Sequence, residues 1–135
     1  MSELFRVRMI VNMAPVTKKN HSRIVYNSKT KVPMVIPSEQ YKKYEREFRF
    51  CSVTVDGTWP LLPIDFPVNV KCTFYMPTKR KCDLTNLLEA IDDVLVKYKY
   101  LEDDNYSIIA GHDGSRVKYD KECPRTEIEI TEVCE

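Results

Sequence analysis

Carboxylates flank one predicted helix in the second half of the chain. Asp83 stands at its start, and Asp103 and Asp104 follow its end in a polar turn. Metal-assisted phosphodiester hydrolysis needs carboxylate oxygens near one Mg²⁺, an ion that keeps several waters and contacts substrate phosphates directly. The residue types at the two ends of the helix therefore suit phosphodiester cleavage, provided that the chain folds back and brings the two ends together.

The spacing permits such a cluster but does not require it. A helix of about 15 residues is about 22 Å long, and about six extended residues return over roughly 20 Å. Two structural interpretations stay open beside metal binding. Asp83 is also typical of a helix N-cap, and the sequence Glu102 to Asp104 is also typical of a solvated turn.

Basic residues precede this acidic half. Lys and Arg outnumber Asp and Glu by seven to one in residues 1–35 and by eight to five in 36–82, whereas residues 83–135 hold six against fourteen. Placed side by side, the two halves would form a basic surface beside an acidic pocket. The candidate phosphate contacts are Lys18, Lys19, Arg23, Lys79, Arg80 and Lys81. A merely solvated basic surface is the alternative.

Hydrophobic periodicity predicts the elements that position these residues. Leu84, Leu87, Leu88, Ile91, Val94, Leu95 and Tyr98 recur at steps of three and four, which indicates a helix with one face on the core. Alternation of apolar and polar residues over 68–76 predicts a strand that leads into the basic run, Thr78 to Lys81. Further strands are predicted at 3–12 and 126–133, with hairpins at 24–28/32–36 and 106–111/116–119. A helix follows Ser38, with Tyr41, Tyr44 and Phe48 on one face, and 53–67 is expected to be irregular.

These elements predict an α+β fold, with a mixed sheet of about six strands and two principal helices in a single domain spanning residues 1–135. Composition supports a folded protein, since 43% of the residues are hydrophobic and 30% charged. No apolar run approaches the roughly 20 residues of a membrane span. The five Cys form no C-x-x-C pair, which argues against zinc and favours reduced thiols in a cytoplasm.

Three segments carry a resemblance to a known family. The run YMPTKRKCDLTNLLEAIDDVL, the later EDDNYSII and the closing TEIEITEV resemble the RusA-like Holliday junction resolvases, small endonucleases associated with phages and prophages. That family has a basic run, D-x-D-N at a helix start, a later D-D pair and a late strand. The similarity covers residues 74–133 well, and it is weaker upstream, where it rests on APVTKKN.

The resemblance implies a homodimer that binds four-way DNA junctions and cuts opposed strands in DNA recombination and repair. The expected cofactor is Mg²⁺, with Mn²⁺ as an alternative, and the expected setting is the cytoplasm of a bacterial host, with the gene carried by a phage or prophage. Carried over by position, the catalytic and metal-binding carboxylates are Asp83 and Asp104. Asp103 is a further metal ligand, and Asn86 is a supporting residue.

Two positions depart from the family pattern. Thr85 stands where the second Asp of D-x-D-N is expected, and Glu89 stands where a Lys is expected. Glu89 lies one helical turn beyond Thr85, so it can restore the missing negative charge as a catalytic and metal-binding residue. The alternatives are a non-catalytic junction-binding protein with a degraded site and a plain structural or interaction domain.

Overall fold

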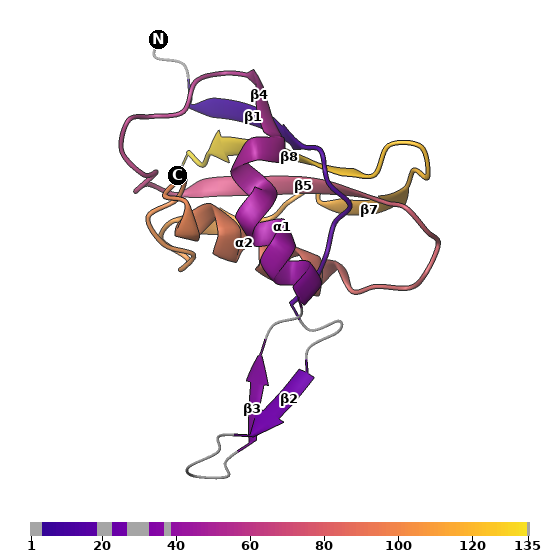
Figure 1. The fold of residues 1–135 in the computed structure, drawn as a ribbon. Coiled ribbons are helices and arrows are strands. Elements are labelled where there is room, and N and C mark those ends of the chain that lie inside the picture. The colour runs from indigo at the N-terminus through magenta and orange to yellow at the C-terminus, as the bar shows by residue number, and fades with distance from the viewer. Residues whose placement is uncertain (1–3, 19–22, 27–32, 37–38, 135) are drawn as a thin grey trace.

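The computed structural model describes residues 4–18, 23–26, 33–36 and 39–134. Six strands form one sheet in the order β4 (Ser52–Asp56), β1 (Arg6–Val11), β8 (Arg125–Glu132), β5 (Val68–Met76), and both β6 (Ile109–Gly111) and β7 (Arg116–Tyr119) then pair with β5. The helices are α1 (Glu39–Cys51) and α2 (Leu84–Lys97). The predicted α+β class, with two helices and a six-stranded mixed sheet, is confirmed (Figure 1).

The core lies between one face of the sheet and the two helices. Alternate residues of the central strands are buried on this face: Val7, Met9 and Val11 of β1, Val68, Val70, Cys72 and Phe74 of β5, and Ile128 and Ile130 of β8. The helices contribute Tyr41, Tyr44, Phe48, Leu87, Leu88, Ile91, Val94 and Leu95 to the same cluster. The predicted apolar faces of both helices and of these three strands are therefore confirmed.

The directions of the strands bring two loops together at the same end of the sheet. β1 and β5 both pair antiparallel with β8, so they run in the same direction and end on the same side of the sheet. The segment after β1 (residues 12–18) and the segment after β5 (residues 77–83) therefore leave the sheet side by side. This topology explains why an early loop and the basic run come together although they are far apart in sequence.

The predicted hairpin of residues 106–111 and 116–119 is wrong. β6 and β7 pair in parallel with successive parts of β5, not with each other. Between them, the Ser115 hydroxyl accepts a hydrogen bond from the backbone N–H of Cys72 at 3.0 Å, and Asn69 makes two hydrogen bonds with the backbone of Asp113. Because these side chains bridge the gap, the chain continues along β5 in one direction and does not reverse at the turn.

The expectation of irregular structure throughout 53–67 is also wrong, because β4 occupies its first residues. β4 pairs antiparallel with β1 at the edge of the sheet, and all of its residues from Val53 to Asp56 are exposed. Val53 and Val55 alternate with polar residues, but both valines are about half exposed, so backbone pairing and not burial of one face sets the position of β4. Trp59 beyond it is partly buried, packs against Tyr100 with the two rings tilted at 53°, and donates a hydrogen bond to Thr54 at 2.9 Å.

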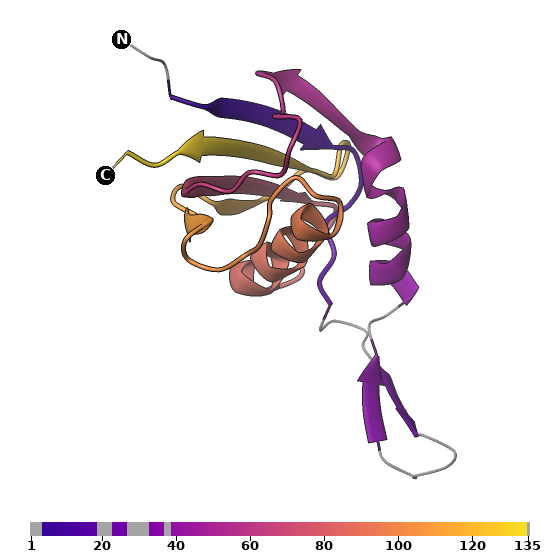
Figure 2. The same ribbon diagram turned by 90° about the vertical axis from the view of Figure 1, so that its left-hand side faces the viewer.

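The early hairpin is confirmed in β2 (Arg23–Tyr26) and β3 (Pro33–Ile36), which pair antiparallel. Both views show this hairpin extending away from the sheet and helices (Figures 1 and 2). The loop residues 27–32 that join its strands and the predicted N-cap Ser38 lie outside the described residues.

Candidate active site

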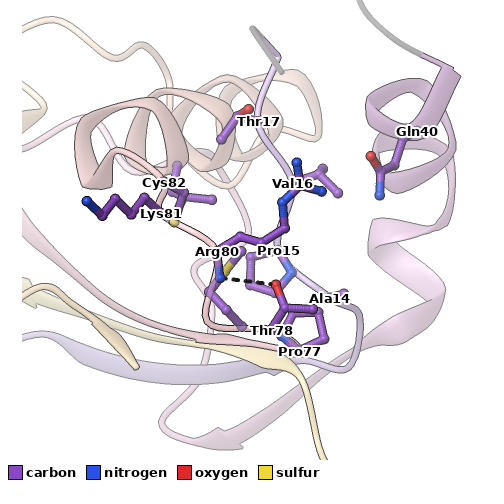
Figure 3. A pocket seen from close by; sticks show the side chains of 12 residues that line it. Ala14, Pro15, Val16, Thr17, Gln40, Pro77, Thr78, Arg80, Lys81 and Cys82 are labelled. Carbon is purple, nitrogen blue, oxygen red and sulfur yellow. Dashed lines mark hydrogen bonds between the residues drawn. The ribbon is translucent and has the colours of Figure 1, made fainter. Parts of the chain in front are cut away.

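A cavity of about 430 Å³ lies where the segments after β1 and β5 meet. Its walls come from both segments, from the first turn of α1 and from the start of α2 (Figure 3). The lining residues are Ala14, Pro15, Val16, Thr17, Gln40, Met76, Pro77, Thr78, Arg80, Lys81, Cys82 and Leu87. Two members of the basic run, Arg80 and Lys81, thus border a formed depression in the surface.

The basic run is exposed at this edge. Lys79, Arg80 and Lys81 are all exposed, and within the described ranges none of the three forms an ion pair with a carboxylate. The Lys79 ammonium lies 5.1 Å from the centre of the Tyr119 ring, a cation–π contact that leaves its charge uncompensated. These cations can therefore take their counter-charge from a polyanion.

The earlier basic loop is placed only in part. Lys18 forms an ion pair with Asp93 of α2 and lies 5.6 Å from the centre of the Tyr41 ring of α1. Lys19 lies outside the described residues, and only the backbone of Arg23 is described, in β2. Lys18 thus links the loop to both helices.

Asp83 occupies the N-cap position of α2, with φ −90° and ψ 125°, but its side chain makes no capping hydrogen bond. Its backbone carbonyl accepts the first helical bonds, from the N–H groups of Asn86 and Leu87. The side-chain amide of Asn86 donates a hydrogen bond to the Asp83 carboxylate at 3.3 Å. Asn86 thus orients an exposed carboxylate that accepts no hydrogen bond from the backbone at the start of α2.

Thr85 and Glu89 are both exposed on the first turns of α2. Their four-residue separation places them on neighbouring turns of the same helix side. The structure therefore keeps both positions accessible on the surface that begins at Asp83.

Asp103 and Asp104 lie beyond the carboxyl end of α2 and share a local hydrogen-bond network. The Asp103 carboxylate accepts the backbone N–H of Asp104 at 2.7 Å and the side-chain amide of Asn105 at 2.9 Å. These bonds lower the pKa of Asp103. The pKa of Asp104 is raised, first by partial burial and then by the neighbouring carboxylates of Asp103 and Asp93.

Asp92 was not among the predicted site residues. Its carboxylate is 13% exposed and contacts Nε2 of His112 through both oxygens, at 2.9 and 3.1 Å. Burial raises its pKa, the contact with His112 opposes that shift, and the charges of Asp104 and Asp93 add to it. Asp92 and Asp93 occupy polar positions of the helical period, between Ile91 and Val94, so the apolar pattern does not single them out.

Asp92, Asp93, Asp103 and Asp104 form what we call the acidic cluster. Asp92 lies nine residues after Asp83 on α2, so about 14 Å of helix axis separates their backbones. The carboxylates that raise the pKa of Asp104 belong to this cluster. The structure thus gathers Asp103 and Asp104 with two unpredicted residues, and it places Asp83 towards the other end of the helix.

The donor chemistry suits a hard divalent cation. In the part of the chain that the structure describes, no group of three or more His, Cys, Asp or Glu is placed to hold one metal ion. Mg²⁺ is nevertheless commonly bound through one or two carboxylates, with water and substrate phosphates completing its coordination. Such oxygens are provided by the exposed Asp83 at the start of α2 and, separately, by the neighbouring residues Asp103 and Asp104 beyond its carboxyl end.

Comparison with family models places this arrangement among the endodeoxyribonucleases. The model described as Endodeoxyribonuclease RusA matches residues 12–131 of the 135 residues. The chain therefore belongs to the RusA endodeoxyribonuclease family, which confirms the resemblance found in the sequence. Comparison with curated proteins gave no match. Among the described residues, no helix combines the length and apolarity needed to cross a membrane.

Proposed function

We propose that this protein is a Mg²⁺-dependent, structure-selective endodeoxyribonuclease that resolves Holliday junctions by paired strand cuts in DNA recombination and repair. One observation carries the proposal within this nuclease family. The exposed cations of residues 79–81 lead directly to Asp83, an exposed carboxylate that Asn86 orients and that makes no capping bond. Such an edge can bind a phosphate backbone and present a carboxylate beside it.

In this proposal, the basic run holds the backbone of the substrate as a set of point charges and bidentate donors. Asp83 and Asp104 are the catalytic carboxylates, and Asp103 and Glu89 add negative charge for the metal. When bound, Mg²⁺, or Mn²⁺ in its place, would polarise the substrate phosphate and activate a water molecule. Asn86 keeps the Asp83 side chain in one orientation, and Thr85, in the same first turn of α2, is a supporting residue.

The proposed partners are a four-way DNA junction and a second copy of the chain. A junction with approximate two-fold symmetry is matched by a two-fold dimer, which places two identical sites on opposed strands. The proposed setting is the cytoplasm of a bacterial host, with the gene carried by a phage or prophage. Light scattering at micromolar concentration tests the dimer, and a monomer mass would contradict it.

A second candidate is a junction-binding protein that does not cut. It is favoured by the association of Asp104 with Asp93 and Asp103 towards one end of α2, while Asp83 stands at the other. Thr85 in place of a carboxylate points the same way. In this alternative, the exposed cations Lys79, Arg80 and Lys81, which we call the basic edge, hold the junction and the carboxylates are structural.

Gel shift and cleavage on one preparation distinguish the two candidates. A labelled four-way junction and a linear duplex of the same arm sequence are incubated with the protein, with Mg²⁺ or with EDTA. The nuclease proposal expects selective junction binding under both conditions and cutting only with Mg²⁺. Binding without cutting supports the second candidate, whereas equal weak binding to both DNAs contradicts both.

A further inference from the structure

The cavity at the basic edge has a lining that resembles neither a plain phosphate groove nor a closed core. Its walls are mainly apolar, from Pro15, Val16, Met76, Pro77 and Leu87. Its polar groups are Thr17, Gln40, Thr78, Arg80 and Lys81. A depression of about 430 Å³ with this lining suits a ligand that is flat and apolar at one end and charged at the other.

The charge of the lining selects the sign of that ligand. Arg80 and Lys81 are cationic, and none of the twelve lining residues is Asp or Glu. The carboxylate of the adjoining Asp83 is held by Asn86, and Asp93 is paired with Lys18. The cavity itself therefore favours an anion, and its apolar walls favour an anion that carries a ring system.

We propose that this cavity receives one unpaired nucleotide of the branched DNA, with its base between the apolar walls and its phosphate against Arg80 and Lys81. The inference rests on the proposed function, because it assumes that the basic edge binds DNA. It adds a base-binding site to an edge that otherwise contacts only the backbone. Apolar contacts with the face of an unstacked base tolerate any sequence, since every base has two flat faces.

Gln40 can read the edge of the inserted base. It lies in the first turn of α1, across the cavity from the segment that carries Arg80 (Figure 3). A side-chain amide offers both a donor and an acceptor, so it can form two hydrogen bonds with one base edge. The backbone N–H of Arg80 is already bonded to the Thr78 hydroxyl, which fixes the opposite rim.

Such a cavity would distinguish a branch point from a continuous duplex. A paired and stacked base must be extruded before it can enter a pocket, whereas a base that is unpaired at a branch enters at a lower cost. Junction selectivity would then come partly from one nucleotide, in addition to the shape of four duplex arms.

The test removes the base and fills the cavity, singly and together. A set of junctions carries one abasic site at successive positions beside the branch, and Kd is measured for wild type, Val16→Trp and Gln40→Leu. We expect one abasic position to weaken wild-type binding by about tenfold, because the burial of one base between the apolar walls is lost. In Val16→Trp, the same abasic site should change Kd by less than twofold, because the indole occupies the cavity. In Gln40→Leu, the abasic effect should fall below that of wild type, because the hydrogen bonds to the base edge are lost. This non-additivity is the signature of a direct contact.

Thr58→Leu is the matched control, because Thr58 is exposed and is not part of the cavity. It should keep the full tenfold abasic effect. Gln40 is exposed on α1, so Gln40→Leu retains the test if Val16→Trp fails to fold.

The outcomes separate this inference from the proposed function. Equal Kd values for intact and abasic junctions in wild type, with junction binding retained, overturn the base site alone. An abasic effect that persists in both variants also overturns it. Failure of wild type to bind any junction overturns both proposals. Competition by millimolar dAMP without any abasic effect would assign the cavity to a free nucleotide and overturn its role in DNA binding.

Discussion

The two ends of α2 hold charge in opposite ways. At the carboxyl end, two residues of the acidic cluster are engaged within the protein, since Lys18 pairs with Asp93 and His112 contacts both oxygens of Asp92. At the amino end, Lys79, Arg80 and Lys81 are exposed, and no ion pair to a carboxylate is found for them in the described residues. Lys18, at the carboxyl end, is thus held by a carboxylate, whereas the cations at the amino end are open to a phosphate.

This difference shows which charges are available to DNA. A cation that is already paired with a carboxylate gains little from a phosphate, because it must first give up its partner. An exposed cation without such a partner releases counterions when it meets a phosphate, and this release drives association. The amino end of α2 is therefore the expected DNA-binding end, and the acidic cluster is expected to position Asp104.

The largest effect is expected from the two carboxylates at opposite ends. Asp83→Asn and Asp104→Asn should each reduce junction cleavage to background while junction binding stays equal or becomes tighter, because a charge that repels phosphate is removed. Asp65→Asn is the matched control, since Asp65 is an exposed carboxylate on another loop. Normal cleavage by both variants would remove these residues from the site. Because Asn caps a helix as well as Asp does, Asp83→Ala tests the structural role, and its unfolding would favour a purely structural N-cap.

A second large effect is expected at Glu89, on the side of α2 between the two ends. If Glu89 replaces the carboxylate missing at Thr85, Glu89→Gln should strongly reduce cleavage. Thr85→Asp combined with Glu89→Lys should recover it, because the double change recreates the family arrangement. The single and double variants should therefore be strongly non-additive in a single-turnover assay. A Glu89→Gln enzyme that cuts like wild type would show that Glu89 is an ordinary surface residue.

An intermediate effect is expected at the basic edge. Replacing Lys79, Arg80 and Lys81 with Ala should flatten the plot of log K against log salt by up to about 2.7 units, at roughly 0.9 per phosphate contact on duplex DNA. Circular dichroism and light scattering should show an unchanged fold and oligomeric state. A salt slope equal to that of wild type would show that the junction is held elsewhere.

A smaller effect is expected from replacing Lys18. This substitution compares a cation that is paired with a carboxylate with the exposed cations of residues 79–81. Lys18→Met should lower the free energy of unfolding by about 1 kcal/mol, because it breaks a partly exposed ion pair with Asp93. Its salt slope for junction binding should change less than that of Lys81→Met, a matched loss of an unpaired cation. The opposite order would contradict the comparison between the two ends of α2.

The smallest effect concerns the pH dependence of the acidic cluster. Because burial raises the pKa of Asp92 above its usual 3.8, the folded state binds this proton more tightly than the unfolded state does. The contribution of Asp92 to stability therefore increases as the pH falls through the window just above 3.8. The Tm difference between wild type and Asp92→Asn should shift in favour of wild type over that window. A constant difference would show that the carboxylate is not buried in solution.

The main elements and the basic edge could be predicted because their signals are local. The apolar period of residues 84–98 and the alternation of 68–76 each report one buried face, and both elements form as expected. The edge strand β4 and the parallel pairing of β6 and β7 could not be read, because backbone partners far away in sequence determine them.

The candidate site was predictable to a similar extent. The resemblance to the family assigned Asp83 and Asp104 by position, spacing only permitted them to meet, and both assignments stay predictions. The neighbours of Asp104 and Asp92 depend on where the chain returns after α2, so the proximity of Asp93 to Asp104 and of His112 to Asp92 was missed. Lys18 was grouped with the DNA-binding cations because a sequence shows charge but not its partner; its ion pair with Asp93 appears only in the fold.

The most direct test of the central claim uses a supercoiled plasmid that extrudes a cruciform, incubated with the wild-type protein. The proposed resolvase should convert it to linear DNA with two opposed cuts at the cruciform base in Mg²⁺ or Mn²⁺, and should leave it supercoiled in EDTA. A relaxed plasmid without the cruciform should remain uncut. A supercoiled plasmid that stays intact with either metal, or equal cutting of both plasmids, would contradict the account.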